Sequence, residues 1–352
     1  MRADTVQTGT EALPAPSPVR EWRDVDRCRF TEEIVPLGQP AVLRGLAADW
    51  PLVRHARRSA QALVDYLIGF DTGALIQAAI IPPEEHGRMA YRGEEKKLNH
   101  RVSTEKLPNV LKGLIKLMEA PSPPGVAIGG LNAETALPGL ADENRTDLLP
   151  EGALAHLWIG NRVTVSPHFD AADNLAVCVA GRRRFTLFPP EQVANLYVGP
   201  FDLTPAGVPI GTVPLDNTDF DRYPKYREAL AVAQVAELDP GDAIYIPYLW
   251  WHGVQSLEPF NMLANFWWHR DEVAAAQPFG RLLRLSYELF RDMPAEHRRA
   301  WKPLFDYWVF EAGGDPTSHL PTAQQTARQN ISAEAIAKFK QALAELFLSV
   351  RE

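Results

Sequence analysis

Residues 236–254 read AELDPGDAIYIPYLWWHGV, and this stretch decides the predicted fold. The Pro-Gly-Asp sequence at 240–242 is a turn signal, since proline presets one backbone angle and glycine tolerates positive φ. The apolar run from Ala243 to Pro247 predicts a short buried strand. His252 follows this strand in a tryptophan-rich context. The stretch therefore predicts a β-structure that carries a polar side chain just past a strand.

The neighbouring sequence repeats this pattern of short apolar or alternating runs. Further runs are LAHLWIG (154–160), NLAVCVAG (174–181), RRFTLFPP (183–190) and NMLANFWWH (261–269). Proline, glycine, aspartate and asparagine separate the runs, which is typical of an all-β sandwich or barrel. We therefore expect a mainly β (α+β) chain with a jelly-roll core at about residues 153–270.

The flanking regions have a different composition. Residues 1–20 are rich in Pro, Ser and Thr and predict a flexible tail. Residues 58–68 and 104–118 have the apolar spacing of amphipathic helices, with Thr104 as the expected N-cap of the second. Polar residues 82–97 predict an exposed hairpin or loop, and residues 190–236 predict a long insertion. The expected organisation is one domain over residues 21–272, with an N-terminal α/β layer, followed by a helical segment over 273–352.

Composition narrows the class of protein. The chain has 352 residues, and 44 acidic and 36 basic residues give a net charge of −8, which argues against a nucleic-acid partner. Only two cysteines occur, Cys28 and Cys178, so a disulfide scaffold is not expected. The N-terminus has no apolar stretch of signal-peptide length, and no window approaches a membrane span of ~18 apolar residues. We expect a cytoplasmic protein without a membrane partner.

A second stretch, TVSPHFDAADN (164–174), contains a candidate metal site. Side chains at positions i and i+2 of a strand share a face, so His168 and Asp170 can point at one ion. His252 supplies the third candidate ligand. Two histidines and one carboxylate form the facial triad of non-haem iron(II) oxygenases. Spacing leaves His156 and His269 open as alternative ligands.

The order of motifs along the chain adds to this interpretation. The motifs are PAVLRGLAADWP (40–51), HFD (168–170), GRRR (181–184), LFPP (187–190), PGD (240–242), IPYLWWH (246–252) and NFW (265–267). Together they resemble the JmjC/cupin-like Fe(II)- and 2-oxoglutarate-dependent oxygenases, and within that group the factor-inhibiting-HIF-type asparaginyl hydroxylases. The resemblance covers roughly residues 20–270.

The resemblance implies a double-stranded β-helix with Fe(II) held by His168, Asp170 and His252. It implies that Arg183, where the family has lysine, pairs with the distal carboxylate of 2-oxoglutarate, because a guanidinium suits a carboxylate bidentately. We expect one arginine of 182–184 to face inward and two outward. The resemblance also implies Asn174 and Asn265 as residues beside the iron and the co-substrate, and Trp267 as a substrate-binding residue.

Two positions depart from the family pattern. Val165 stands where relatives place a hydroxyl three residues before the first ligand. No tyrosine lies at 125–128, where relatives place one that binds the co-substrate carboxylate. Tyr91 or Tyr245 is expected to complete the pocket, and Tyr91 is also a predicted substrate contact.

The implied activity is hydroxylation of an unactivated C–H bond, using O2 and releasing succinate and CO2. A protein or peptide side chain is the expected substrate. The alternatives are a small-molecule hydroxylase, a lysine demethylase of the same fold, or a non-catalytic cupin-like metal- or ligand-binding protein. The resemblance further implies a homodimer formed by the C-terminal helices, with Trp301, Phe305, Trp308 and Phe310 as its apolar interface.

Overall fold

The computed structural model describes residues 15–92, 97–150, 153–201, 208–216, 218–270 and 279–322, and also residues 204, 325, 338, 341, 342 and 344. The chain divides into two compact units, Met1–Gly280 and Arg281–Glu352. The first unit contains the predicted β-core and all the candidate site residues.

Eight consecutive strands of the first unit form a jelly roll. They are β8 (Ala155–Gly160), β9 (Thr164–His168), β10 (Asp173–Ala180), β11 (Arg183–Phe188), β12 (Gln234–Leu238), β13 (Ala243–Ile246), β14 (Trp251–Ser256) and β15 (Asn261–Trp268). One sheet contains β12-β11-β14-β9 and the other contains β13-β10-β15-β8, in those orders. This arrangement of antiparallel strands confirms the predicted jelly-roll core.

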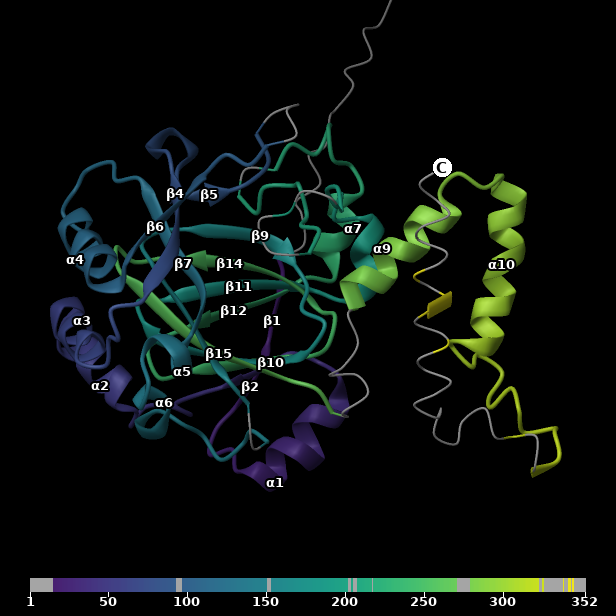
Figure 1. Cartoon of the computed structure of the whole chain (residues 1–352), viewed down its shortest axis with the longest axis horizontal. Coiled ribbons are helices and arrows are strands. Elements are labelled where there is room, and N and C mark those ends of the chain that lie inside the picture. Colours follow the sequence, from purple (N-terminus) through teal and green to yellow (C-terminus); the bar gives the residue numbers. More distant parts are fainter. Residues whose placement is uncertain are drawn as a thin grey trace, which may run out of the picture. The chain divides into compact units, whose positions relative to one another are not determined.

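Seven further strands widen both sheets (Figure 1). β1 (Ser17–Pro18) and β5 (Arg88–Met89) lie at the two ends of a six-stranded sheet. The other sheet gains β2 (Arg20–Trp22) and β3 (Ala41–Leu43) on one side, and β7 (Gly125–Asn132), β4 (Leu75–Ile81) and β6 (Arg101–Lys106) on the other. The resulting nine-stranded sheet ends at β6. The N-terminal region thus contributes strands directly to the core sheets. The tail expected over residues 1–20 was therefore set too long, because Ser17–Pro18 pairs with β12 and Arg20 begins β2.

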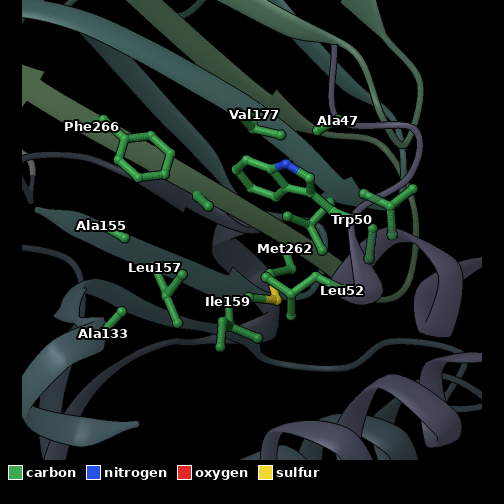
Figure 2. Packing of buried hydrophobic residues seen from close by; sticks show 14 of the residues in the cluster. Ala47, Trp50, Leu52, Ala133, Ala155, Leu157, Ile159, Val177, Met262 and Phe266 are labelled. Atoms are coloured by element: carbon green, nitrogen blue, oxygen red, sulfur yellow. The ribbon is translucent and has the colours of Figure 1, made fainter. Parts of the chain in front are cut away.

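Helices cover the face of the nine-stranded sheet that points away from the barrel. They are α2 (Pro51–Arg58), α3 (Ala60–Ile68), α4 (Leu107–Leu117), α5 (Ala133–Ala136) and α6 (Leu140–Glu143), whereas α1 (Arg27–Arg29) is a single turn with no buried residue. Figure 2 shows the apolar core of this layer, in which the Trp50 indole lies among Leu52, Val177 and Met262. A smaller apolar core lies between the two sheets and includes Phe185, Leu187 and Ile244. Burial on both faces explains why β10 is apolar at nearly every position.

The helix predicted at 104–118 begins later than expected. Thr104 is not its N-cap, because it pairs with Gln77 in the β4–β6 ladder. The helix instead starts at Leu107, with Pro108 in its first turn, where a missing N–H costs no hydrogen bond. The helix predicted at 58–68 is α3, capped by Ser59, whose hydroxyl accepts a hydrogen bond from the Ala62 N–H.

The polar segment and the long insertion contact each other. Within the segment expected as an exposed hairpin or loop (82–97), Tyr91 forms an antiparallel bridge with Leu98, and the Asn99 N–H donates to the Ala90 carbonyl beside it. The Tyr91 ring lies so close to Gly199 that a Cβ there would clash with it. The insertion contains α7 (Tyr226–Ala231) and a 3-10 segment (Pro190–Ala194). Its Gly211 N–H donates to the Pro167 carbonyl at 2.7 Å, next to the first candidate metal ligand.

The second unit contains α10 (Ala295–Trp308) and all but the first two residues of α9 (Phe279–Phe290), as expected for a helical segment. Beyond residue 322, the helical segment expected over 273–352 lies almost entirely outside the described residues. In α10 and just after it, Trp301, Trp308 and Phe310 are exposed. Among the described residues, no helix is both long and apolar enough to cross a membrane.

Candidate metal and co-substrate site

His168, Asp170 and His252 come together at one end of the jelly roll. His168 ends β9 and is the cross-strand partner of His252 on β14, and their ring centroids lie 4.3 Å apart. Asp170 follows β9 by two residues, and its Oδ2 lies 3.6 Å from Nε2 of His252. One potential ligand atom from each residue lies within 4.8 Å of the others. Within the described part of the chain, these three residues form the one such cluster of His, Cys, Asp and Glu side chains.

Backbone carbonyls fix the orientation of both imidazoles. Nδ1 of His168 lies 3.0 Å from the Ser166 carbonyl oxygen, and Nδ1 of His252 lies 3.1 Å from that of Trp250. A carbonyl oxygen can only accept, so each Nδ1 carries the proton and each Nε2 presents a lone pair. Loss of hydration around its ring and the neighbouring His252 lower the pKa of the half-buried His168, which keeps this ring neutral at physiological pH.

The Asp170 carboxylate is held by two donors. Its Oδ2 accepts hydrogen bonds of 2.9 Å from Nδ2 of Asn174 and from Nε1 of Trp267. Behind Asn174, Asn265 donates from its Nδ2 to the Asn174 Oδ1 at 3.4 Å. Asn265 in turn accepts a 2.8 Å hydrogen bond from the Trp158 indole N–H. These contacts hold the carboxylate in one orientation, as outer residues do at metal sites.

Arg183 provides a buried positive charge in the same space. Its side chain is 7% exposed, its Nη2 donates to the Trp158 carbonyl at 3.2 Å, and its buried Nε has no hydrogen-bond partner. No carboxylate among the described residues forms an ion pair with it. Burial lowers the pKa of Arg183 to about 10, so the guanidinium stays charged at neutral pH. An uncompensated buried cation with a spare donor is suited to binding an anion.

The two neighbouring arginines point outward. Arg182 pairs with Glu258 at 2.8 Å and Arg184 lies 4.0 Å from Glu237, all at the surface. Strand alternation produces this pattern, since Arg183 starts β11 with its side chain on the inner face. The expectation of one inward and two outward arginines is confirmed.

A cavity of about 370 Å³ joins the cluster to Arg183. Its walls are mainly apolar, and they belong to both sheets of the barrel and to β4–β7. The lining residues are Gln77, Ala79, Met89, His100, Val102, Ala127, Gly129, Trp158, Val165, His168, Asp170, Asn174, Ala176, Arg183, Phe185, Ile246, His252, Val254, Leu263, Asn265 and Trp267. This size lies within the range of about 300–1,000 Å³ that is typical of small-ligand pockets.

The structure brings most of the predicted site residues to this cavity, but not the two tyrosines. Tyr91 lies against Gly199 and does not line the cavity, so its role in substrate binding stays a prediction. Tyr245 was expected as a possible replacement for the missing co-substrate tyrosine. Its hydroxyl instead donates to Asp173 at 2.6 Å on the other face of the sheet, where Arg270 also binds Asp173. Val165 does line the cavity and offers no hydroxyl there.

The alternative metal ligands lie outside the cluster. The His156 ring lies 4.8 Å from the Trp267 ring, and neither His156 nor His269 belongs to the group of potential ligands. Sequence reasoning missed the cavity wall formed by Gln77, Ala79 and His100. No single-sequence signal marks these residues, because their position depends on β4 and β6 extending the core sheet.

The fold and the site define a cupin-type jelly roll with a His-Asp-His cluster at its open end. A family profile described as the Cupin-like domain matches residues 27–273, and the chain belongs to this family. The family assignment confirms the class that the motif order predicted. A match over most of the first unit leaves the second unit outside the family domain.

Several characterised proteins are similar to parts of this chain. HSPB1-associated protein 1 of Homo sapiens is 32% identical over 144 residues, 37% of this chain and 29% of that protein. tRNA wybutosine-synthesizing protein 5 of Gallus gallus is 29% identical over 146 residues, 37% of this chain and 42% of that protein. Lysine-specific demethylase JMJ31 of Arabidopsis thaliana is 35% identical over 106 residues, 30% of this chain and 19% of that protein. The matches thus span less than half the length of each of these relatives.

Proposed function

We propose that the chain is an Fe(II)- and 2-oxoglutarate-dependent oxygenase that hydroxylates an unactivated C–H bond. The observation that carries this proposal is the shared cavity of a His-Asp-His cluster and the buried, unpaired Arg183 guanidinium. A metal-binding protein without a co-substrate has no need for that buried cation, whose desolvation costs free energy.

The donor set fits iron(II). Two neutral imidazole nitrogens and one carboxylate on one side of an ion leave its other positions open. His168, Asp170 and His252 would hold the metal, and Arg183 would bind the far carboxylate of 2-oxoglutarate. Bound iron with this co-substrate and O2 would supply the oxidising power for hydroxylation, with release of succinate and CO2.

The protein's own residues would orient and shield the reaction. Asn174 and Trp267 fix the Asp170 carboxylate, and the backbone carbonyls fix the imidazoles. The apolar side chains Phe185, Val254 and Leu263 line the cavity and would exclude water around the metal. No described carboxylate forms an ion pair with Arg183, which leaves its charge available for the co-substrate.

A protein or peptide side chain is our proposed substrate. The names of the relatives point to different substrates, a tRNA nucleoside for one and a lysine residue for another. Lysine demethylation by this chain is a second candidate, favoured by the likeness to JMJ31. The perpendicular Trp158 and Trp267 rings, 6.3 Å apart, could accept a methylammonium group. A small-molecule hydroxylase and a non-catalytic ligand-binding protein are the remaining alternatives.

Anaerobic titration with Fe(II) and 2-oxoglutarate, followed by O2 and measurement of succinate, tests the oxygenase proposal. We expect 2-oxoglutarate to bind only with metal and succinate to form slowly even without substrate. The absence of both metal-dependent binding and succinate release would reject the enzyme and leave the ligand-binding alternative.

We also propose a homodimer formed through the second unit. The exposed side chains of Trp301, Trp308 and Phe310 support it, because monomers rarely expose several large aromatic residues together. Light scattering at micromolar concentration tests this directly. A mass of 39.2 kDa would identify a monomer and contradict the proposal.

A further inference from the structure

The cavity face of the nine-stranded sheet continues beyond the cavity onto β4 and β6. Gln77 and Ala79 on β4 line the cavity, as do His100 just before β6 and Val102 within it. Because strand side chains alternate, Leu75, Thr104 and Lys106 share this face. The ladder pairs Ala79 with Val102, Gln77 with Thr104 and Leu75 with Lys106. We call the face formed by Leu75, Gln77, Val102, Thr104 and Lys106 the shelf.

The shelf is open and partly apolar. Leu75 is 66% exposed and Val102 is 58% exposed, and Gln77, Thr104 and Lys106 are also exposed. The opposite face of the same strands packs against helices, as the burial of Ile76 and Ala78 shows. Exposed aliphatic side chains on a sheet face leave apolar area in water, which a bound partner would remove.

Continuity with the cavity indicates what covers the shelf. Val102 and Gln77 belong both to the cavity wall and to the shelf, so the two surfaces are one. The cavity of about 370 Å³ lies at the small end of ligand pockets, with space for a co-substrate and one side chain. The rest of a larger substrate must lie outside, and the shelf adjoins the opening.

We propose that the shelf binds an extended polypeptide substrate, with an aliphatic side chain over Leu75 and Val102. Lys106, at the far end of the shelf, forms no ion pair with any described residue and would pair with an acidic residue of the peptide. This proposal rests on the proposed oxygenase function and specifies its substrate class.

Pools of capped nonapeptides provide a test that needs no known substrate. In each pool one position is fixed as leucine, and a matched pool has serine at that position. Succinate release by the iron-loaded full chain is measured with and without each pool. We expect leucine at certain positions to stimulate release, and an added acidic residue to strengthen the effect. The best single peptide is then used with variants.

The variant Leu75→Asp should raise the KM for that peptide at least tenfold, with kcat within twofold. The matched control is Val193→Asp, an equally simple change at an aliphatic residue that is 48% exposed and lies away from the cavity lining. The control should change KM less than twofold. Lys106→Glu should remove the preference for an acidic residue.

Three outcomes would contradict the proposed role of the shelf in peptide binding. Leu75→Asp and Val193→Asp could give the same KM, or leucine and serine pools could stimulate equally. The third outcome is a protein that releases succinate without any peptide and releases no more of it with any pool. A wild-type protein that neither binds 2-oxoglutarate nor releases succinate would instead reject the proposed function, and the role of the shelf with it.

Discussion

The indole Nε1 of Trp267 donates a 2.9 Å hydrogen bond to Oδ2 of Asp170. Trp267 lies on β15, directly opposite Asn174 on β10, which donates to the same oxygen. Two strands of one sheet thus hold a carboxylate that belongs to the end of the other sheet. The predicted substrate contact Trp267 therefore also serves the metal cluster.

Replacing Trp267 with phenylalanine should weaken metal binding about tenfold, the lower end of effects seen for residues behind metal ligands. The aromatic ring is kept and only the donor is lost, so Asp170 gains orientational freedom. Anaerobic calorimetry with Co(II) measures this affinity. Trp268→Phe is the matched control, since Trp268 packs against Phe30 and Tyr245 on the opposite face. Equal affinities for the two variants would contradict the role of this hydrogen bond.

Loss of a ligand should have a larger effect. Asp170→Ala or His168→Ala removes one of three donors, and we expect no measurable Co(II) binding and no succinate release. Removing the carboxylate also removes the negative charge that offsets the metal charge. Circular dichroism should show an unchanged fold, because both residues are only partly buried at the mouth of the barrel. Full turnover by either variant would reject the cluster as the metal site.

Arg183→Met should separate function from stability. The variant should lose 2-oxoglutarate binding, because the cavity then holds no cation for the far carboxylate. It should also stabilise the ligand-free protein by about 1–4 kcal/mol, since an apolar side chain replaces a buried charge without a partner. Urea unfolding and 2-oxoglutarate titration measure the two effects. The control Arg182→Met, at an exposed position, should change neither 2-oxoglutarate binding nor stability. Unaltered 2-oxoglutarate binding by Arg183→Met would reject Arg183 as the residue that binds the far carboxylate.

The members of the candidate metal cluster could be predicted from the sequence, because they lie within motifs of fixed local geometry. His168 and Asp170 are two residues apart at a strand end, and His252 follows a strong turn and strand signal. The inward direction of Arg183 follows from strand alternation. Local patterns thus predicted the jelly roll and the residues around the metal.

The remaining cavity wall depends on long-range strand pairing, which a local pattern does not encode. β4 and β6 precede β8 in the sequence by a long stretch that includes α4 and β7, yet they join the core sheet, and their register brings Gln77 and Val102 to the cavity. Pairing also explains the wrong N-cap at Thr104, where a ladder with β4 prevails over helix propensity. Alternation also does not decide which sheet face carries Tyr245. Its strand is buried on both faces, so apolar residues occur at every position and do not mark the inner face.

The two cysteines should differ sharply in reactivity. Cys178 is fully buried in β10, and burial raises the pKa of its thiol to about 12, whereas Cys28 is exposed. We expect a disulfide-exchange reagent at pH 8 to titrate one thiol in the native protein and two in urea, because the thiolate reacts. In the native variant Cys28→Ala, the number of thiols that react should fall to zero.

The raised pKa of Cys178 also has a consequence for stability. The unfolded thiol ionises near pH 9, while the folded thiol stays protonated until about pH 12. The unfolded state therefore loses a proton first, and the contribution of this thiol to stability is complete below pH 9 and declines as pH rises towards 12. Cys178→Ala should flatten this alkaline decline in urea unfolding. Cys28→Ala should change the decline much less, because Cys28 is exposed and water screens the Glu32 carboxylate that raises the pKa of its thiol. An unchanged slope for Cys178→Ala would show that the thiol is not held protonated in the barrel.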